Sequence, residues 1–151
     1  MSTNNTQHTA AYQIVGAFIK VNDGLTNLGT ISRVAHMQLN DPDQPHALMA
    51  WSDSNSYPAI MYRSSDRQEI EERFKEVSSL VLKQKKRKFI RTKKLLVATD
   101  LIAGCTPIVK DANVWISISL LLPDTKPLWV ACDSKEELDE DMEAIERQLS
   151  A

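Results

Sequence analysis

Apolar and polar residues alternate along residues 113–122. The apolar positions are Val114, Ile116, Ile118 and Leu120. The positions between them include Trp115, Ser117 and Ser119. This period of two is typical of a β-strand with one buried face. A Pro-Asp-Thr-Lys-Pro segment at 123–127 predicts a turn, and the apolar run Leu128 to Cys132 predicts the strand that follows it.

A helical spacing replaces the alternation after residue 133. Apolar residues recur there at intervals of four, three and four, which places them on one face of an α-helix. These residues are Leu138, Met142, Ile145 and Leu149. Asp133 or Ser134 is suited to cap the helix, and Glu136 and Glu137 fall in its first turn, where the helix dipole favours negative charge.

The same arrangement occurs earlier in the chain. Ser64 or Ser65 is suited to cap a helix whose first turns contain Glu69. Its apolar stripe consists of Ile70, Phe74, Val77 and Val81. The sequence therefore predicts two amphipathic helices, each placed after a series of strands.

The two series align with each other. Residues 18–21 match residues 89–92 at an offset of 71, and the same offset places Leu25 on Leu96 and Ile31 on Ile102. After an extra loop at 41–45 the offset becomes 68. This offset pairs Leu48 and Ala50 with Ile116 and Ile118, and it also superimposes the two helical stripes. The pattern favours an internal repeat. The alternative is that the likeness is only the common pattern of small α+β proteins.

We interpret each copy as four strands followed by a helix. The first copy spans 12–82, a basic connector spans 83–88, and the second copy spans 89–151, after a polar tail at 1–11 that we expect to be disordered. A unit of about 65 residues is near the lower limit for folding alone, so the copies should pair. The predicted fold is α+β, with tandem duplicated ββββα units forming one pseudo-two-fold domain with antiparallel sheets and two helices.

The composition is that of an ordinary globular chain. It has 151 residues, 42% hydrophobic and 25% charged, with a formal charge of −2. No apolar stretch is long enough to cross a membrane, and the N-terminus lacks the plan of a signal peptide. We therefore expect a cytoplasmic protein whose two cysteines, Cys105 and Cys132, are reduced.

Positive charge is concentrated between the two copies. Eight of twelve residues are basic: Lys83, Lys85, Lys86, Arg87, Lys88, Arg91, Lys93 and Lys94. The C-terminal segment 133–151 holds eight acidic residues against two basic ones. The basic run could bind the phosphates of a polyanion. It could instead be a solvated connector that blunts a sheet edge, or it could pair with the acidic C-terminal helix within the chain or across a dimer.

Two tryptophans are candidates for stacking on nucleic-acid bases. Trp115 lies among serines, opposite the aliphatic set of its strand, and Trp51 lies opposite Leu48 and Ala50. An aromatic side chain on the polar face of a sheet can serve as a stacking platform. The alternative is that both faces are buried by the other copy, which would make each tryptophan part of the core.

Motifs of catalysis and cofactor binding are missing from the sequence. There is no nucleophile elbow, P-loop or dinucleotide fingerprint, and the three histidines have no ligand partners at zinc spacing. We therefore expect neither an enzyme nor a metal or cofactor site.

The repeated order of four strands and a helix resembles the PUR-repeat proteins. It is also similar to the plant Whirly and mitochondrial guide-RNA-binding proteins that share their fold. In that group two copies make one domain, and single-stranded DNA or RNA binds on the sheets. The resemblance covers residues 12 to 150 as an order of elements. The Gly-containing, Arg-rich strand pair of the PUR signature is absent, so no binding residue is carried over.

The second copy taken alone also resembles the small flagellar FlbD-like proteins. The residues concerned run from Phe89-Ile90-Arg91-Thr92 through Asp100-Leu101-Ile102 to the helix start at 133–138. That pattern of four strands and a helix is generic, and a fold alone does not name a ligand.

These observations lead to a first functional hypothesis, a non-catalytic binder of single-stranded nucleic acid. The eight basic residues would hold phosphates, and Trp51 and Trp115 would stack on bases. The second hypothesis is a protein-interaction module, such as an adaptor, inhibitor or assembly subunit, because the charge is segregated along the chain and uncovered strand edges invite added strands. Its partner could be a second copy of the chain in a homodimer. A weaker third hypothesis is a small-molecule sensor that uses the cleft between the copies.

Overall fold

The computed structural model describes residues 12–53 and 58–151. The tail expected at 1–11 lies outside these residues. The described elements of the first half are β1 (Gln13–Val15), β2 (Phe18–Val21), β3 (Gly24–Asn27), the 3-10 turn η1 (Leu28–Thr30), β4 (Ile31–Gln38), β5 (His46–Ser52), β6 (Ala59–Ser64) and α2 (Arg67–Lys83). Those of the second half are β7 (Phe89–Arg91), β8 (Leu95–Ala98), the 3-10 turn η2 (Thr99–Leu101), β9 (Ile102–Lys110), β10 (Asn113–Leu120), β11 (Leu128–Cys132) and α3 (Lys135–Ser150).

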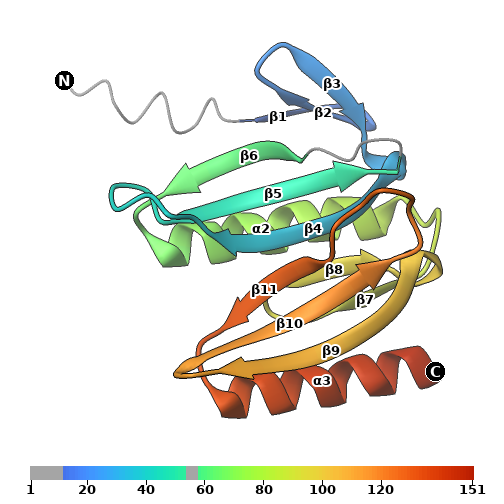
Figure 1. The fold of residues 1–151 in the computed structure, drawn as a ribbon. Coiled ribbons are helices and arrows are strands. Elements are labelled where there is room, and N and C mark those ends of the chain that lie inside the picture. Colours follow the sequence, from blue (N-terminus) through green and yellow to red (C-terminus); the bar gives the residue numbers. More distant parts are fainter. Residues whose placement is uncertain (1–11, 54–57) are drawn as a thin grey trace.

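Three sheets contain these strands. The largest has the order β6-β5-β4-β8-β7, and the two smaller ones have the orders β1-β2-β3 and β11-β10-β9. Every strand pair is antiparallel. Strands β7 and β8 follow α2 in the chain, yet they complete the sheet that the first half begins (Figure 1).

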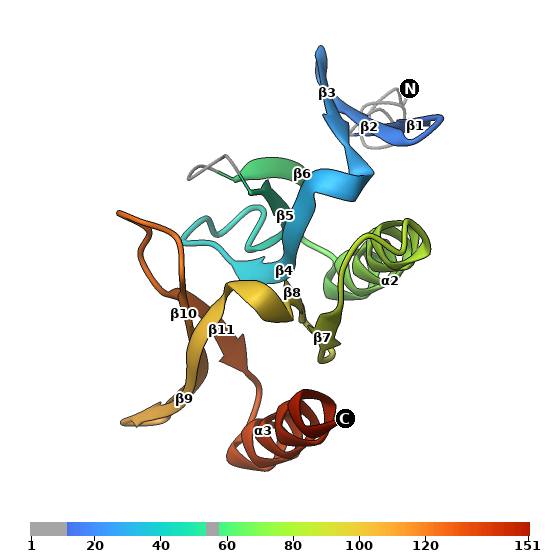
Figure 2. The same cartoon turned by 90° about the vertical axis from the view of Figure 1, so that its right-hand side faces the viewer.

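The first core lies between α2 and one face of the five-stranded sheet. The sheet contributes Val34, Leu48, Ala50 and Leu96 to this core. The helix contributes Ile70, Phe74, Val77 and Val81, which is the stripe predicted from the sequence. Figure 2 shows α2 lying along this face.

The second core lies on the opposite face of the same sheet. That face contributes Ala35, Trp51, Leu95 and Val97. The residues packed against it come from β10, β11 and α3 and include Ile116, Ile118, Val130, Leu138 and Ile145. In Figure 2 the edge strand β7 lies between the two helices. Both cores therefore share the five-stranded sheet.

The structure confirms an α+β protein with antiparallel sheets and, among the residues it describes, two α-helices, but the number of strands differs from the prediction. Six strands precede α2 and five precede α3, where four were expected in each half. In the second half, η2 divides the stretch 95–109 into β8 and β9. The cap of α2 is Asp66, whose side chain accepts from the Gln68 N–H, rather than Ser64 or Ser65. Ser134 caps α3 as predicted.

The two halves also match in strand register. At the offset of 71, Ile19 opposite Thr26 in β2–β3 corresponds to Ile90 opposite Val97 in β7–β8. At offsets of 71 and 68, Val34 opposite Ala50 in β4–β5 corresponds to Cys105 opposite Ile118 in β9–β10. Both halves therefore place corresponding residues at corresponding positions within their hairpins.

No helix among the described residues is both long and apolar enough to cross a membrane.

Candidate nucleic-acid interface

The structure separates the eight basic residues into exposed and buried groups. The exposed ones are Lys83, Lys85, Lys86, Lys88 and Lys93. Arg87 and Arg91 are partly buried, and Lys94 is only 5% exposed. Lys83, Lys85, Lys86 and Lys88 form no ion pair with a described carboxylate. Only part of the run is therefore open to a ligand.

Arg87 is held by two carboxylates. Its Nη1 lies 2.8 and 2.7 Å from the two oxygens of Asp53, and its Nη2 lies 2.9 and 2.8 Å from those of Asp100. Asp53 follows β5 and Asp100 belongs to η2, so this side chain ties the connector to both halves. A guanidinium occupied in this way is not available to a phosphate, and we omit Arg87 from the interface.

Lys94 is buried and paired as well. Its ammonium lies 3.0 Å from Asp133, 3.4 Å from Glu137 and 3.1 Å from the Ala131 carbonyl oxygen. Together with Arg67, it holds the pKa of Asp133 well below its usual range. Pairing of the basic run with the acidic C-terminal segment, one of the three alternatives for this run, is made here by Lys94.

A cleft next to α2 brings together two further residues of the basic run. It encloses about 720 Å³ and is lined by Arg91 and Lys93, with Lys75 of α2 and Gln148 of α3. The Gln148 side chain accepts from the Arg91 N–H at 2.7 Å and donates to the Arg91 carbonyl at 2.8 Å. An amide side chain, rather than a carboxylate, therefore holds the edge strand β7 to α3.

The structure places Trp51 in the second core, which corrects its role as a stacking residue. Its side chain is 7% exposed, and the guanidinium of Arg33 lies 5.2 Å from the centre of its ring. Strand β5 is buried on both faces, because α2 covers one face and the second half covers the other. A tryptophan at this position fills the core.

Trp115 has the placement that the alternation predicts. Val114, Ile116 and Ile118 face the second core, so Trp115 is on the opposite face of the β9–β11 sheet. Trp129 of β11 is on the same face, because it pairs with Ser117. The two rings lie 5.6 Å apart, and Trp129 is 45% exposed. The sequence analysis missed Trp129, although its position between Leu128 and Val130 carries the same signal.

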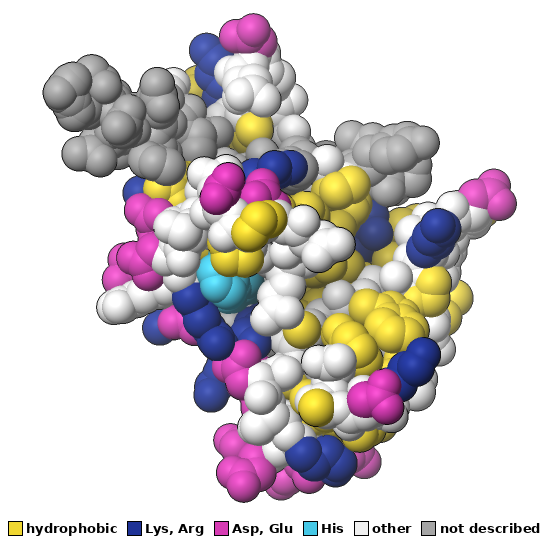
Figure 3. Space-filling model, turned by 60° about the vertical axis from the view of Figure 1, so that its left-hand side comes forward, with side chains coloured by type: hydrophobic (Ala, Val, Ile, Leu, Met, Phe, Trp, Pro, Cys, Tyr) yellow, Lys and Arg dark blue, Asp and Glu magenta, His cyan; other side chains and the backbone are white. Residues whose placement is uncertain are grey.

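Two lysines lie at the ends of strands that form this open face. Lys110 ends β9 and Lys126 precedes β11, and both are exposed. Figure 3 shows hydrophobic side chains gathered in this region of the surface, with Lys and Arg side chains near them. A surface that joins aromatic rings and cations can accept both parts of a nucleotide, the base and the phosphate.

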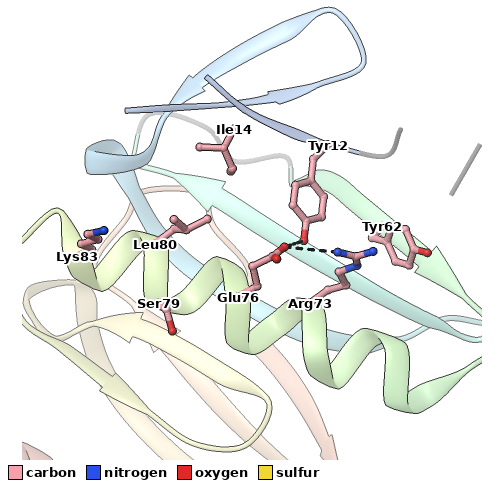
Figure 4. Close-up of a pocket in the computed structure, with 8 residues that line it drawn as sticks. All are labelled: Tyr12, Ile14, Tyr62, Arg73, Glu76, Ser79, Leu80 and Lys83. Carbon is pink, nitrogen blue, oxygen red and sulfur yellow. Dashed lines mark hydrogen bonds and ion pairs between the residues drawn. The ribbon is translucent and has the colours of Figure 1, made fainter. Parts of the chain in front are cut away.

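A pocket of about 560 Å³ lies between α2 and the segment that leads into β1 (Figure 4). The Tyr12 hydroxyl donates to Glu76, and burial raises the pKa of Tyr12. The Arg73 guanidinium lies 5.9 Å from the Tyr12 ring, 5.3 Å from the Tyr62 ring and 3.6 Å from Glu76. These groups pair with one another across the pocket, so they fasten the N-terminal strands to α2.

The two histidines of the described chain lie together, although the sequence suggested no relation between them. His36 Nε2 is 3.1 Å from His46 Nδ1 across β4 and β5. Burial, followed by the charge of Lys94, lowers the pKa of His36 to about 4. Burial, followed by the charge of Arg67, lowers the pKa of His46 as well, so both rings favour the neutral form at pH 7.

A third cluster consists of Cys132, Glu137 and Asp141, whose potential ligand atoms lie within 4.8 Å of one another. Burial and the neighbouring carboxylates raise the pKa of Cys132 to about 11, so its thiol stays protonated and unreactive at neutral pH. The Lys94 ammonium, 3.4 Å from Glu137, already supplies a positive charge here.

No protein-family model matches the chain, and no curated protein or solved structure matches it either.

Proposed function

We propose that the protein is a non-catalytic binder of single-stranded nucleic acid, and that bases stack on the open face of the β9–β11 sheet. The observation that carries this proposal is the pair of tryptophans, Trp115 and Trp129, with rings 5.6 Å apart on a face that neither helix covers. Stacking on an aromatic ring is tolerant of sequence, because every base has a flat face.

Phosphate contacts in this proposal come from exposed lysines and from the half-buried Arg91. Lys110 and Lys126 flank the aromatic face. The remaining candidates lie at the end of α2, in the connector, in β7 and just after it: Lys83, Lys85, Lys86, Lys88, Arg91 and Lys93. Trp51, Arg87 and Lys94 are left out, because the first is in the core and the other two are held by carboxylates.

We also propose that the two halves are copies of one unit, which gives the chain its resemblance to PUR-repeat and Whirly proteins. The matching registers at offsets of 71 and 68 support this proposal. Backbone contacts support it as well. The Leu28 N–H donates to the Ala17 carbonyl at 2.9 Å, and the corresponding Thr99 N–H donates to the Lys88 carbonyl at 2.9 Å.

Fluorescence anisotropy with a labelled single-stranded oligonucleotide at low salt tests the nucleic-acid proposal. Replacing Trp115 and Trp129 by Ala should each weaken binding by about 5- to 150-fold, the loss expected for one stacked base. Trp51→Phe is the matched control, because it changes a tryptophan of the core and leaves the open face intact. Binding that is undetectable at low salt, or equal in the wild type and the Trp115 and Trp129 variants, would contradict the proposal.

Salt dependence separates the two groups of lysines. Lys110→Ala with Lys126→Ala should reduce the steepness with which binding falls as salt increases, because fewer counterions are released. The triple variant Lys83→Ala, Lys85→Ala and Lys86→Ala should do the same if the connector contacts the strand. A salt slope that neither variant changes would remove these lysines from the interface.

A protein-interaction module is the second candidate function. It is favoured by apolar side chains exposed on the β1–β3 sheet: Ile14, Val15, Phe18 and Leu25. Exposed apolar groups beside an open strand edge are typical of surfaces that receive another chain.

A further inference from the structure

Strands β3 and β8 occupy corresponding positions in the two halves but have different neighbours. Strand β8 lies between β7 and β4, whereas β3 has only β2 beside it within residues 12–53 and 58–151. In both cases the preceding strand pairs in the same register, so that Lys20 opposite Leu25 corresponds to Arg91 opposite Leu96. Strand β3 therefore lacks the neighbour that β4 provides for β8.

Strands β4 and β9 form the reciprocal case. Strand β4 has two neighbours, β5 and β8, whereas in the described part of the chain β9 pairs only with β10 and forms the edge of its sheet. The shared register of β4–β5 and β9–β10 makes the free edge of β9 the counterpart of the edge of β4 that receives β8. Among the described residues, β3 thus lacks the neighbour that its counterpart β8 has, and β9 lacks the neighbour that its counterpart β4 has.

Burial shows what each strand loses. All four residues of β8 are buried, and Leu96 is 0% exposed. Its counterpart in β3, Leu25, is 58% exposed. Strand β4 is buried along its first six residues, whereas β9 contains no fully buried residue. An exposed leucine in a strand with an open edge favours pairing with another strand.

These two edges cannot meet within one chain. Figure 1 shows β3 at one end of the molecule and β9 at the other, with the five-stranded sheet between them. We propose that the free edge of β9 pairs with β3 of a second copy, as β4 pairs with β8 inside the chain. The result is a six-stranded sheet in the order β11-β10-β9-β3-β2-β1, whose last three strands come from the second copy.

The internal pairing also supplies the register of this interface. Inside the chain, Arg33, Val34 and Ala35 lie opposite Val97, Leu96 and Leu95. The transferred antiparallel register places Gly104 opposite Thr26, Cys105 opposite Leu25, and Thr106 opposite Gly24 of the second copy. Leu25 then leaves solvent and takes the buried position that Leu96 has in the five-stranded sheet.

Pro107 limits the length of the pairing. It corresponds to His36, whose N–H donates to the Lys94 carbonyl at 2.8 Å as the ladder between β4 and β8 ends. Proline has no N–H to donate, so the intermolecular ladder ends at Thr106. Proline is tolerated on an edge strand where its nitrogen points away from the neighbouring strand. Pro107 therefore marks the open side of β9, and the N–H of Cys105, two residues earlier, points to the same side.

The assembly runs head to tail. Each copy donates β3 from its first half and receives a strand on β9 of its second half, so the two contacts use different surfaces of the molecule. Such a heterologous contact continues from copy to copy unless the rotation closes a ring. This interface uses neither Trp115 nor Trp129, and its test needs no nucleic acid, so its failure is distinguishable from failure of the nucleic-acid proposal.

Sedimentation equilibrium of the full chain provides the test. The wild-type mass should rise above the 17.0 kDa of one chain as concentration increases from micromolar to sub-millimolar. Leu25→Pro removes the outward-facing N–H of β3, and Cys105→Pro removes the outward-facing N–H of β9. Each variant, measured alone, should therefore keep the mass of one chain. The matched controls, Leu25→Ala and Cys105→Ala, keep the N–H and should still associate, with Leu25→Ala weaker because it buries less apolar surface.

Mixing the two proline variants is the decisive measurement. The Leu25→Pro variant keeps an intact β9, and the Cys105→Pro variant keeps an intact β3, so the mixture should form a dimer of twice 17.0 kDa and nothing larger. A wild type that remains monomeric throughout, or a mixture that gives no dimer while both variants are folded by circular dichroism, would overturn the proposal.

A charge pair tests the register without proline, and it applies even if a proline variant does not fold. A side chain at Gly104 has open space around its Cβ position. Gly104→Lys combined with Thr26→Lys places like charges opposite each other across the interface and should abolish association. Gly104→Lys with Thr26→Glu should restore it. Equal association of both double variants would exclude this register.

Discussion

Asp141 is a buried carboxylate on the inner side of α3. It is 8% exposed, and its Oδ2 lies 4.0 Å from the Cys132 sulfur. Burial, followed by the charge of Glu137, raises its pKa to about 6. The folded protein therefore holds a proton at Asp141 that the unfolded chain releases at a lower pH.

This raised pKa predicts a pH dependence of stability. Because the folded-state pKa is above the unfolded-state value, the protonated carboxyl stabilises the fold fully below about pH 4, and this contribution is lost as the pH rises through about 6. The stability gained by Asp141→Asn, relative to the wild type, should therefore grow by about 2 kcal/mol between pH 4 and 7. Urea unfolding at both pH values measures this difference.

Asp139→Asn is the control for this measurement. Asp139 is on the same helix, but it is exposed and pairs with Lys135 at 2.6 Å on the surface. Its substitution should change stability by less than about 1 kcal/mol at either pH. A stability difference for Asp141→Asn that is constant with pH would show that its carboxyl titrates normally.

Residue patterns predicted side-chain roles where burial follows a simple period. The alternation in 113–122 placed Trp115 on the open face correctly, because that strand has only one face in a core. The same kind of alternation in β5 wrongly placed Trp51 on an open face, because β5 is covered on both sides. Composition could not separate Lys94 from its exposed neighbours either, because its burial depends on Asp133 and Glu137, about 40 residues away in sequence.

The connector after α2 is held in place mainly through Arg87. This side chain is 15% exposed and forms ion pairs with both carboxylates, Asp53 through Nη1 and Asp100 through Nη2. Planar guanidinium groups suit such contacts, and the lysine ammonium does not reproduce them.

Arg87→Ala should therefore lower the free energy of unfolding by about 1 kcal/mol, a modest value because both carboxylates are largely exposed to water. Arg87→Lys should recover less than half of this loss. Thermal unfolding at low salt measures the effect, with the adjacent exposed Lys88→Ala as control. If Arg87→Ala and Lys88→Ala have equal melting temperatures, the connector is not held by this contact.

Local elements could be predicted from the sequence, but their neighbours in the sheets could not. Both helical stripes and the strands around 113–120 and 128–132 are encoded within short windows. The pairing of β8 with β4 joins residues that are 60 or more positions apart, and no local pattern predicts it. The same limit hid the open edges of β3 and β9, because an edge is defined by a missing neighbour.

The five-stranded sheet makes the two cores interdependent at the scale of the whole molecule. In β4, Val34 belongs to the first core and the adjacent Ala35 to the second. In β8, Leu96 faces the first core, while Leu95 and Val97 face the second. Strands β4 and β8 contribute to both cores. If one core unfolds, these strands lose the packing on one face, and the other core loses the sheet against which it packs.

The chain should therefore unfold in a single transition. Phe74→Ala removes a side chain of the first core and Ile116→Ala one of the second. These substitutions should lower the free energy of unfolding by about 3–5 and 2–5 kcal/mol respectively.

Far-UV circular dichroism follows the secondary structure of both halves, whereas tryptophan fluorescence reports on Trp51, Trp115 and Trp129, in and around the second core. If the chain unfolds in a single transition, Phe74→Ala lowers the urea midpoint measured by fluorescence and the midpoint measured by circular dichroism by the same amount. If instead Phe74→Ala leaves the fluorescence curve in place and moves only part of the dichroism signal, each half unfolds independently, and β7–β8 does not couple the two cores through β4.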